Sequence, residues 1–413
     1  MKLWNQTGVL SAGLLALALV AGCGGDAKKK DAKGTDAGAN TEASKPEMKL
    51  SKKAEDLKVK ASDVKSLVKK GTPIDAATYK KLILAHADCK VTENGIDSKC
   101  EAVTAMREAM NRSQLAKGLL GGNAKLGVEL IDHEAPAVRI KAAKMMGSMI
   151  GSAKESQDAI VARMDKEDVP AVMKAMVRTV RNAGAKNPKV GEMLLKLADH
   201  KDPMIRKEAI YGLSSSFNKE LEGGPEKLIA LMKDDEDADV RRKACKHAGG
   251  LGDAKLFPAY KELLQNREDG KLWGSCFEGL VAMWADYPLY GTDSQDAYKL
   301  TMELLKSKPR TKEIPPWTVM SRFGYLNGEK NEKLTEWKKK ATWFKLADLN
   351  KVLQEIVTDK DANWMTRTGS VKALAKTGEK ADLEKLRKTF GDDPKGDESH
   401  VAKALDKAIA GEK

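Results

Sequence analysis

The sequence predicts an all-α solenoid of antiparallel helix pairs, with an N-terminal helical cap and an irregular aromatic-rich insertion. Only 5% of the 413 residues are aromatic and 32% are charged, a composition typical of helical chains rather than sandwiches or barrels. A helix-turn pattern recurs along the chain, with an aliphatic residue at positions 138, 172, 205 and 240, so that the steps are 34, 33 and 35 residues. Fixed periods of this length indicate stacked repeats.

Residues 1–22 have the features of an export signal. Lys2 supplies a positive charge, and an apolar stretch of 13 residues follows from Val9 to Ala21, which is too short to span a bilayer with ease. The stretch ends in Val20-Ala21-Gly22-Cys23. This ending resembles the lipobox of bacterial lipoproteins, and the alternative is an ordinary signal peptide followed by an incidental cysteine.

The lipobox resemblance implies a lipid anchor. In that family the cysteine sulfur receives diacylglycerol, the chain is cleaved before the cysteine, and the new amine is acylated, which implies these modifications at Cys23. By analogy with the sorting of that family, Gly24 in place of aspartate favours the outer membrane, so we expect a lipid-anchored protein of the bacterial cell envelope. Residues 23–50 contain almost nothing to bury and are predicted to form a disordered tether.

Four cysteines remain after Cys23, and an exported protein favours disulfides between them. Cys89 and Cys100 bracket a loop that contains Asn94-Gly95, a turn signal that would fold the loop back on itself, so we expect these two to pair. Cys245 and Cys276 either pair or remain buried thiols, because equivalent positions in neighbouring repeats often lie too far apart for a bridge.

The turns of the repeat share a pattern of an acid, then proline, then an aliphatic residue, arginine and alanine. The clearest copies run from Asp132 to Ala143, Asp199 to Ala209 and Asp234 to Ala244, the last with alanine in place of the proline. The pattern resembles the HEAT repeat family, which implies antiparallel helix pairs. In that family the arginine bridges to an acid of the adjacent turn. Arg139, Arg206 and Arg241 match this position, whereas Met173 does not.

The pattern divides the chain into further segments. Residues 113–282 carry the HEAT-like units, and residues 346–413 carry two more. Residues 51–112 are predicted to form an N-terminal helical cap, which includes a helix opened by Pro73-Ile74 and running to Leu84, because terminal units of repeat arrays need a covering element.

Residues 283–345 break both the period and the composition. The stretch 273–364 holds 13 of the 20 aromatic residues, and the stretch 305–345 has eleven Lys and Arg against four acids. A basic aromatic segment favours binding of an anionic or sugar-like ligand, whereas the alternative is an enlarged repeat whose aromatics fill its own core. The candidate binding residues are Trp317, Arg322, Tyr325, Trp337 and Trp343.

No catalytic, metal-binding or cofactor-binding motif occurs in the sequence. The five histidines are scattered without ligand spacing, so we expect neither a metal nor a cofactor, and no enzymatic activity. The favoured function is binding of an envelope protein by the helical scaffold. The alternative is binding of an acidic envelope polymer, peptidoglycan or polysaccharide, by the insertion. Nucleic-acid binding is permitted by the net charge of +13, but export argues against it.

Overall fold

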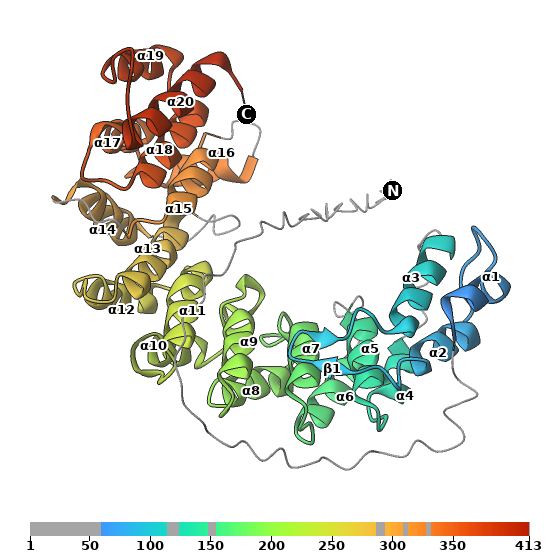
Figure 1. The fold of residues 1–413 in the computed structure, drawn as a ribbon. Coiled ribbons are helices and arrows are strands. Elements are labelled where there is room, and N and C mark those ends of the chain that lie inside the picture. The colour runs from blue at the N-terminus through green and yellow to red at the C-terminus, as the bar shows by residue number, and fades with distance from the viewer. Residues whose placement is uncertain are drawn as a thin grey trace, which may run out of the picture. The chain divides into compact units, whose positions relative to one another are not determined.

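The structure is a computed structural model, and it describes residues 59–113, 124–147, 154–285, 294–308, 313–327 and 332–412. The predicted all-α solenoid of antiparallel helix pairs is confirmed over these ranges (Figure 1). No helix in the described ranges has the length and apolar character needed to cross a membrane. The predicted signal peptide, the predicted lipidation site Cys23 and the tether lie outside the described residues.

The helices of the solenoid form two layers. The first layer holds α4 Ala124–Leu130, α6 Lys154–Met164, α8 Pro188–Leu197, α10 Gly224–Asp234, α12 Phe257–Leu263, α14 Gln295–Lys306, α17 Leu346–Thr358 and α19 Lys380–Lys388. The second layer holds α5 Pro136–Gly147, α7 Pro170–Val180, α9 Pro203–Leu213, α11 Ala238–Ala248, α13 Gly270–Ala285, α15 Pro316–Arg322, α18 Trp364–Thr377 and α20 Asp397–Ala410. Each second-layer helix contacts the next one along the chain.

The second-layer helices begin where the sequence pattern predicts. Proline occupies the first position of α7 and α9, where its missing amide hydrogen is not needed. Asp202 caps α9, because its Oδ1 accepts from the Met204 amide at 2.8 Å. The recurring aliphatic residues are all fully buried, and they are Val138, Val172, Ile205 and Val240. Each unit therefore buries its apolar side against its neighbours, as stacked repeats must.

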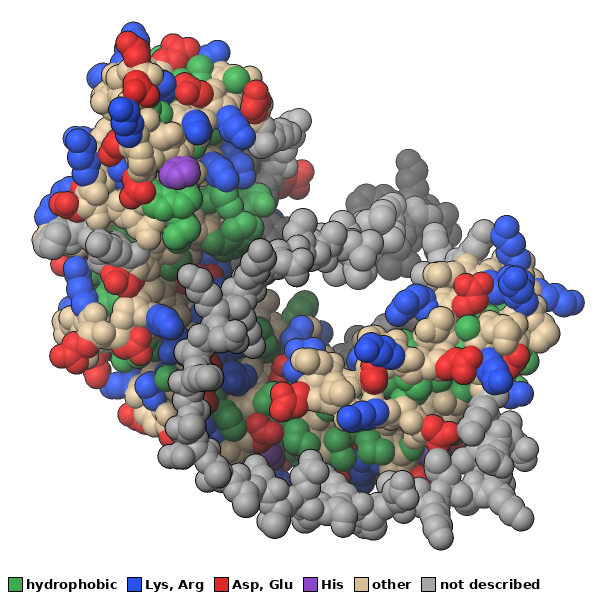
Figure 2. Space-filling view, viewed as in Figure 1, with side chains coloured by type: hydrophobic (Ala, Val, Ile, Leu, Met, Phe, Trp, Pro, Cys, Tyr) green, Lys and Arg blue, Asp and Glu red, His purple; other side chains and the backbone are tan. Residues whose placement is uncertain are grey.

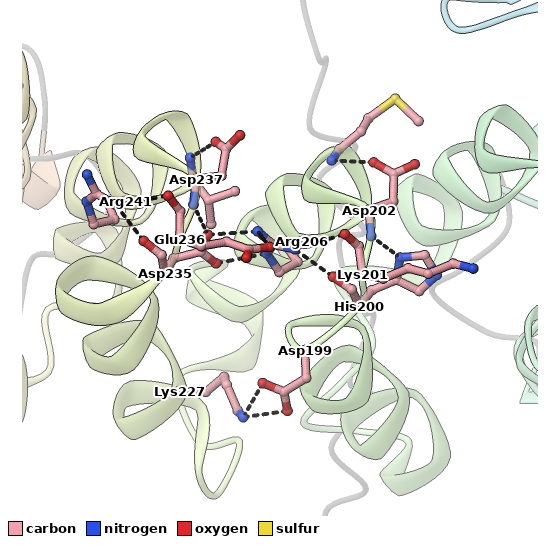
Figure 3. Close-up of polar contacts among 12 residues, drawn as sticks. Asp199, His200, Lys201, Asp202, Arg206, Lys227, Asp235, Glu236, Asp237 and Arg241 are labelled. Carbon is pink, nitrogen blue, oxygen red and sulfur yellow. Dashed lines mark hydrogen bonds and ion pairs between the residues drawn. The ribbon is translucent and has the colours of Figure 1, made fainter.

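Buried arginines connect the turn of one repeat to the turn of the next. Arg206 Nε and Nη2 each lie 2.8 Å from a carboxylate oxygen of Asp235, 29 residues further on, and Nη1 donates to the His200 carbonyl at 2.8 Å (Figure 3). Arg139 makes the same paired contact with Glu167 at 2.8 Å. Both arginines are nearly buried, so these ion pairs are fixed parts of the repeat stack. Bidentate contacts of this kind also define relative orientation.

Arg367 in α18 is another member of this series that the sequence pattern missed. It is 2% exposed, and its Nη1 and Nη2 lie 3.0 and 3.1 Å from the two carboxylate oxygens of Glu398. Its Nε donates to the Val357 carbonyl at 2.9 Å. The signal was hidden because Trp364 and Met365 occupy the start of this helix, where α5, α7 and α9 carry proline and α11 carries alanine.

The N-terminal cap consists of short helices and a hairpin. The elements are η2 Ala61–Asp63, α1 Val64–Leu67, α2 Ala76–Leu84, β1 Val91–Thr92, β2 Gly95–Ile96 and α3 Glu101–Ser113. The helix predicted to open at Pro73 begins three residues later, because Asp75 caps it by accepting from the Thr78 amide at 2.9 Å. The strands pair antiparallel inside the loop. Cys89 and Cys100 are joined as expected, with their Cα atoms 5.6 Å apart.

The Cys245–Cys276 pair, which the sequence left undecided, is also joined, with a Cα separation of 4.5 Å. Glycine explains the close approach of α11 and α13. A Cβ atom on Gly249 would lie 1.8 Å from the Gly279 carbonyl oxygen, and one on Gly279 would lie 2.0 Å from the Cys245 carbonyl oxygen. Because neither residue has a side chain, the two backbones come into direct contact, and equivalent positions fall within bridging distance.

The insertion is an enlarged repeat. Helix α14 contacts α12, α13 and α17, and α15 lies between α13 and α18 in the second layer. The extra elements are η6 Phe323–Tyr325 and α16 Glu332–Lys340. Tyr298 lies 5.0 Å from Trp284, 5.2 Å from Trp343 and 5.8 Å from Phe344 between ring centroids. Most of the aromatic excess therefore forms the core of this repeat.

Candidate functional site

A groove of about 890 Å³ opens between α11, α13, the segment 313–316 and the start of α18. We call it the α13–α15 groove. Ile314, Pro315, Pro316 and Met365 provide its apolar lining. Charged residues of both signs line the rest, and they are Arg242, Lys246, Glu268, Asp269, Lys271, Glu278 and Glu313. Apolar contact surface together with charged residues is found at protein-binding surfaces.

Two glycines position the segment that forms the apolar wall. A Cβ atom on Gly274 of α13 would lie 2.8 Å from the Glu313 carbonyl oxygen, and one on Gly369 of α18 would lie 2.7 Å from the Pro316 carbonyl oxygen. Thr366 is buried, and its hydroxyl donates to the Ile314 carbonyl at 2.8 Å. The segment 313–316 is therefore held at its backbone from two helices. Its proline rings remain at the surface of the groove, half-buried.

Large apolar side chains are exposed beside the groove. Trp317, which follows Pro316, is 64% exposed, and Met365 in the groove wall is 46% exposed. Hydrophobic side chains gather over α15 and α18 in the space-filling view (Figure 2). A tryptophan left this accessible is unusual in a chain whose other described tryptophans are buried or half-buried. Contiguous exposed apolar surface marks interaction sites.

The structure does not bring the five predicted binding residues into one site. Trp337 is 4% exposed, and its ring lies 5.8 Å from Trp343 and 5.1 Å from Phe344. The prediction of Trp337 as a binding residue is therefore corrected, because its ring is enclosed in the core of the enlarged repeat. Trp343 is half-buried in the same cluster.

The other three predicted residues lie at or near the surface on α15 and η6. Trp317 is at the start of α15 beside the groove. Tyr325 is 71% exposed, and the Lys376 Nζ lies 5.0 Å from its ring centroid. Arg322 is half-buried and lines a separate cavity between the second-layer helices. The segment thus presents two exposed aromatics and one cation, with no shared pocket among them.

The sequence did not single out Met365 or the glycines of the groove as functional residues. Gly274 and Gly369 stand inside helices, where glycine is unfavourable by about 1 kcal/mol relative to alanine. A glycine at such a position therefore indicates that another backbone approaches the helix closely. It does not indicate which segment makes the contact. In the sequence, Met365 is one residue of a repeat turn. The sequence pattern does not distinguish a buried methionine from an exposed one at this position.

The polar side chains of the groove include charged groups of both signs. Lys246 Nζ and Glu278 Oε2 form an ion pair in its wall, at 3.1 Å. Across the described ranges, no group of three or more His, Cys, Asp or Glu residues is placed to hold a metal ion. The chemistry available in the groove is apolar contact, hydrogen bonding and ion pairing, which are the interactions of a binding surface.

No family model matches the sequence, and no curated protein matches it. Solved structures do match. The complex of CpcE and CpcF of phycocyanin lyase from Nostoc sp. PCC7120 is 14% identical, covering 69% of this chain and 94% of that chain, with a TM-score of 0.34. An engineered protein is also 14% identical, covering 56% of this chain and 98% of that chain, with a TM-score of 0.31.

Proposed function

We propose that this chain is a membrane-anchored scaffold of HEAT-type repeats that binds a partner protein in the bacterial cell envelope through the α13–α15 groove. The exposed indole of Trp317 beside the groove is the observation that supports this proposal most directly. Tryptophan is among the residues that dominate protein-binding energy. Met365 adds a flexible apolar contact that adapts to a partner's shape.

Protein binding is favoured over binding of an acidic polymer by the insertion. The polymer hypothesis needs accessible aromatic faces among the basic residues of the insertion. Trp337 is enclosed, and Trp343 packs against Tyr298 at 5.2 Å between ring centroids. The groove also carries Glu268, Asp269 and Glu278, which would repel an acidic polymer.

The anchor part of the proposal rests on the sequence from Val20 to Cys23. The two joined cysteine pairs support an exported protein, because disulfides persist in oxidising compartments. Acyl chains on Cys23 would hold the protein at the membrane, and Gly24 favours the outer membrane. The solenoid would then present the groove to partners in the envelope. We propose no catalytic activity, since the groove offers binding contacts alone.

Site-specific photocrosslinking tests the groove. A photoreactive amino acid replaces Met365 in the full-length chain expressed in its own envelope, and the matched control replaces Phe217, a large apolar residue on η3 Ser216–Asn218 that is 62% exposed. We expect one discrete crosslinked protein from position 365 and none from position 217. With the purified partner, Trp317→Ala should weaken binding about 30-fold, corresponding to about 2 kcal/mol. Equal crosslinking at both positions, or unchanged affinity, would contradict the proposal.

Mass spectrometry tests the anchor independently. We expect the mature chain to begin at Cys23 with diacylglycerol and an amide-linked acyl chain. Cys23→Ser should move the protein from the membrane fraction to the soluble fraction. An unmodified N-terminal peptide in the native protein would remove the anchor from the proposal, while leaving the groove experiment unaffected.

A further inference from the structure

A second cavity, separate from the function proposed above, lies where the C-terminal ends of α7, α9 and α11 meet α15. Its volume is about 300 Å³, at the lower end of the range for small-molecule sites. Three cationic side chains line it, Arg181, Lys246 and Arg322, and its described lining includes no aspartate or glutamate. We call it the basic cavity.

The cations of the basic cavity are held by ordered neighbours. Asn218 is 2% exposed, and its side-chain amide donates to the Gly212 carbonyl at 2.9 Å and also to the Arg181 carbonyl. This contact fixes the end of α7 against the end of α9. The Arg181 guanidinium carbon lies 5.6 Å from the Tyr211 ring centroid, and the Lys243 Nζ lies 4.4 Å from the same centroid. Tyr211, which lines the cavity, is therefore in contact with two cations.

Hydroxyl groups complete the lining. Ser214, Ser215 and Ser216 are consecutive and half-buried at the cavity wall. The Ser215 hydroxyl donates to Asn182 Oδ1 at 3.0 Å, so this turn is ordered through its side chain. Serine hydroxyls donate to anionic oxygens without adding charge. The lining thus combines charged donors with neutral donors.

The electrostatic environment of His247 agrees with an excess of positive charge. Burial first, and then the charges of Lys243, Lys246 and Arg322, lower the pKa of His247 to about 4. Its ring lies 4.8 Å from the Tyr211 ring between centroids. The histidine is consequently neutral near pH 7, and the positive charge at the cavity comes from the arginines and lysines.

We propose that the basic cavity binds a phosphate group, carried either by a soluble phosphate compound or by a phospholipid headgroup. A guanidinium presents paired donors that match phosphate oxygens, and an ammonium adds a compact point charge. Arg181, Arg322 and Lys246 provide both kinds of cation around one small space. The Ser214 and Ser216 hydroxyls supply donors for the remaining oxygens, whereas the Ser215 hydroxyl is already bonded to Asn182.

Calorimetric titration of the detergent-solubilised full-length protein tests this site. The probes are inorganic phosphate and the water-soluble dihexanoyl phosphatidic acid, at constant ionic strength. We expect saturable binding that weakens at least tenfold in Arg181→Gln. Ser216→Glu, which adds a carboxylate to the wall, should abolish it. The matched control is Lys233→Gln, because Lys233 pairs with Glu262 at 2.7 Å on the first-layer helix α10 and lines neither site.

The two probes separate the sources of the phosphate. Tighter binding of the phosphatidic acid, lost in Arg181→Gln, supports the site with a lipid headgroup as its ligand. Equal or tighter binding of inorganic phosphate, with the same loss, supports the site with a soluble ligand. Absence of saturable binding by both probes would overturn the proposal, as would wild-type affinity in the folded Arg181→Gln and Ser216→Glu proteins. The cations would then serve only to offset the partial negative charge of the helix ends.

Discussion

Gly249 in η4 Gly249–Leu251 and Gly279 in α13 place their backbones in direct contact, and the Cys245–Cys276 bridge lies beside that contact. The Tyr260 hydroxyl donates to the Cys245 carbonyl at 2.6 Å in the same place. The junction of α11 with α13 thus combines a close glycine contact, a covalent bond and a buried hydrogen bond. The groove and the basic cavity both border this junction, since Lys246 follows Cys245.

Loss of the Cys245–Cys276 bridge should destabilise the solenoid. The bridge closes a loop of 31 residues, for which chain entropy gives a stabilisation of about 3–4 kcal/mol. We expect the double variant Cys245→Ala, Cys276→Ala to unfold at lower denaturant concentration, as measured by circular dichroism. The comparison is Cys89→Ala, Cys100→Ala, whose shorter loop predicts a smaller loss. Identical midpoints for wild type and the 245/276 variant would contradict the prediction.

Gly279→Ala should damage the fold more than an ordinary glycine substitution. The added Cβ atom would lie 2.0 Å from the Cys245 carbonyl oxygen and 2.3 Å from the Tyr260 hydroxyl, so α11 and α13 must separate. We expect a loss of several kcal/mol in the free energy of unfolding, comparable with severe overpacking. Gly250→Ala is the control, because its nearest neighbour would be 3.5 Å away. Similar stability of the two variants would show that the junction can relax.

Arg206→Met should be strongly destabilising. Asp235, its partner, has a side chain that is only 4% exposed, and removing one member of a buried pair costs about 3–5 kcal/mol. The control Lys227→Met breaks the exposed pair with Asp199 and should change the free energy of unfolding by less than about 1 kcal/mol. Urea titration of both variants at pH 7 measures the difference. A loss in Arg206→Met no larger than in the control would mean that the pair contributes little.

Stability should fall as the solution is acidified from pH 6.5 towards pH 4. Burial first, and Lys141 second, lower the pKa of His86 to about 4, whereas an unfolded histidine titrates near 6.5. Between these values the unfolded chain binds a proton that the folded chain does not. The free energy of unfolding therefore falls by up to about 1.4 kcal/mol for each pH unit of acidification because of this residue. His86→Leu should flatten the pH dependence of the urea midpoint, and an unchanged slope would contradict the assignment.

Trp337 and Trp317 should respond oppositely to alanine substitution. Trp337→Ala removes a buried ring and should cost about 3–5 kcal/mol. Trp317→Ala should leave the free energy of unfolding within about 0.5 kcal/mol of wild type, because exposed residues contribute little. Thermal unfolding of the two variants provides the measurement. If Trp317→Ala were the more destabilising, its indole would belong to the core and not to the binding surface.

The solenoid could be predicted because its determinants are local. The aliphatic contact recurs at a fixed spacing, and turns such as those before α9 and α11 also carry their own cap, Asp202 and Asp237. The Cys245–Cys276 bridge could not be decided in this way, because the spacing of two neighbouring repeats depends on Gly249 meeting Gly279. Glycines reveal such a contact only after the register of both helices is known.

The candidate site was harder to predict for a similar reason. Trp317 and Trp337 belong to the same basic aromatic segment, yet one is exposed and the other is enclosed. Trp337 is enclosed because its ring packs against Trp343 and Phe344 in the folded chain. The composition of the segment does not predict these contacts. The groove itself needs Gly369 of one repeat to meet Pro316 of another, a pairing of residues far apart in the sequence.

Lys246 lines both the basic cavity and the α13–α15 groove, and it pairs with Glu278 at 3.1 Å. An anion that attracted this ammonium would draw it away from the carboxylate and leave a bare negative charge in the groove. The two ligands would therefore sense each other through a single side chain. If the anion changes the affinity of the groove for its partner by some factor, the partner changes the affinity of the basic cavity for the anion by the same factor. A small ion would then regulate the binding of a large partner.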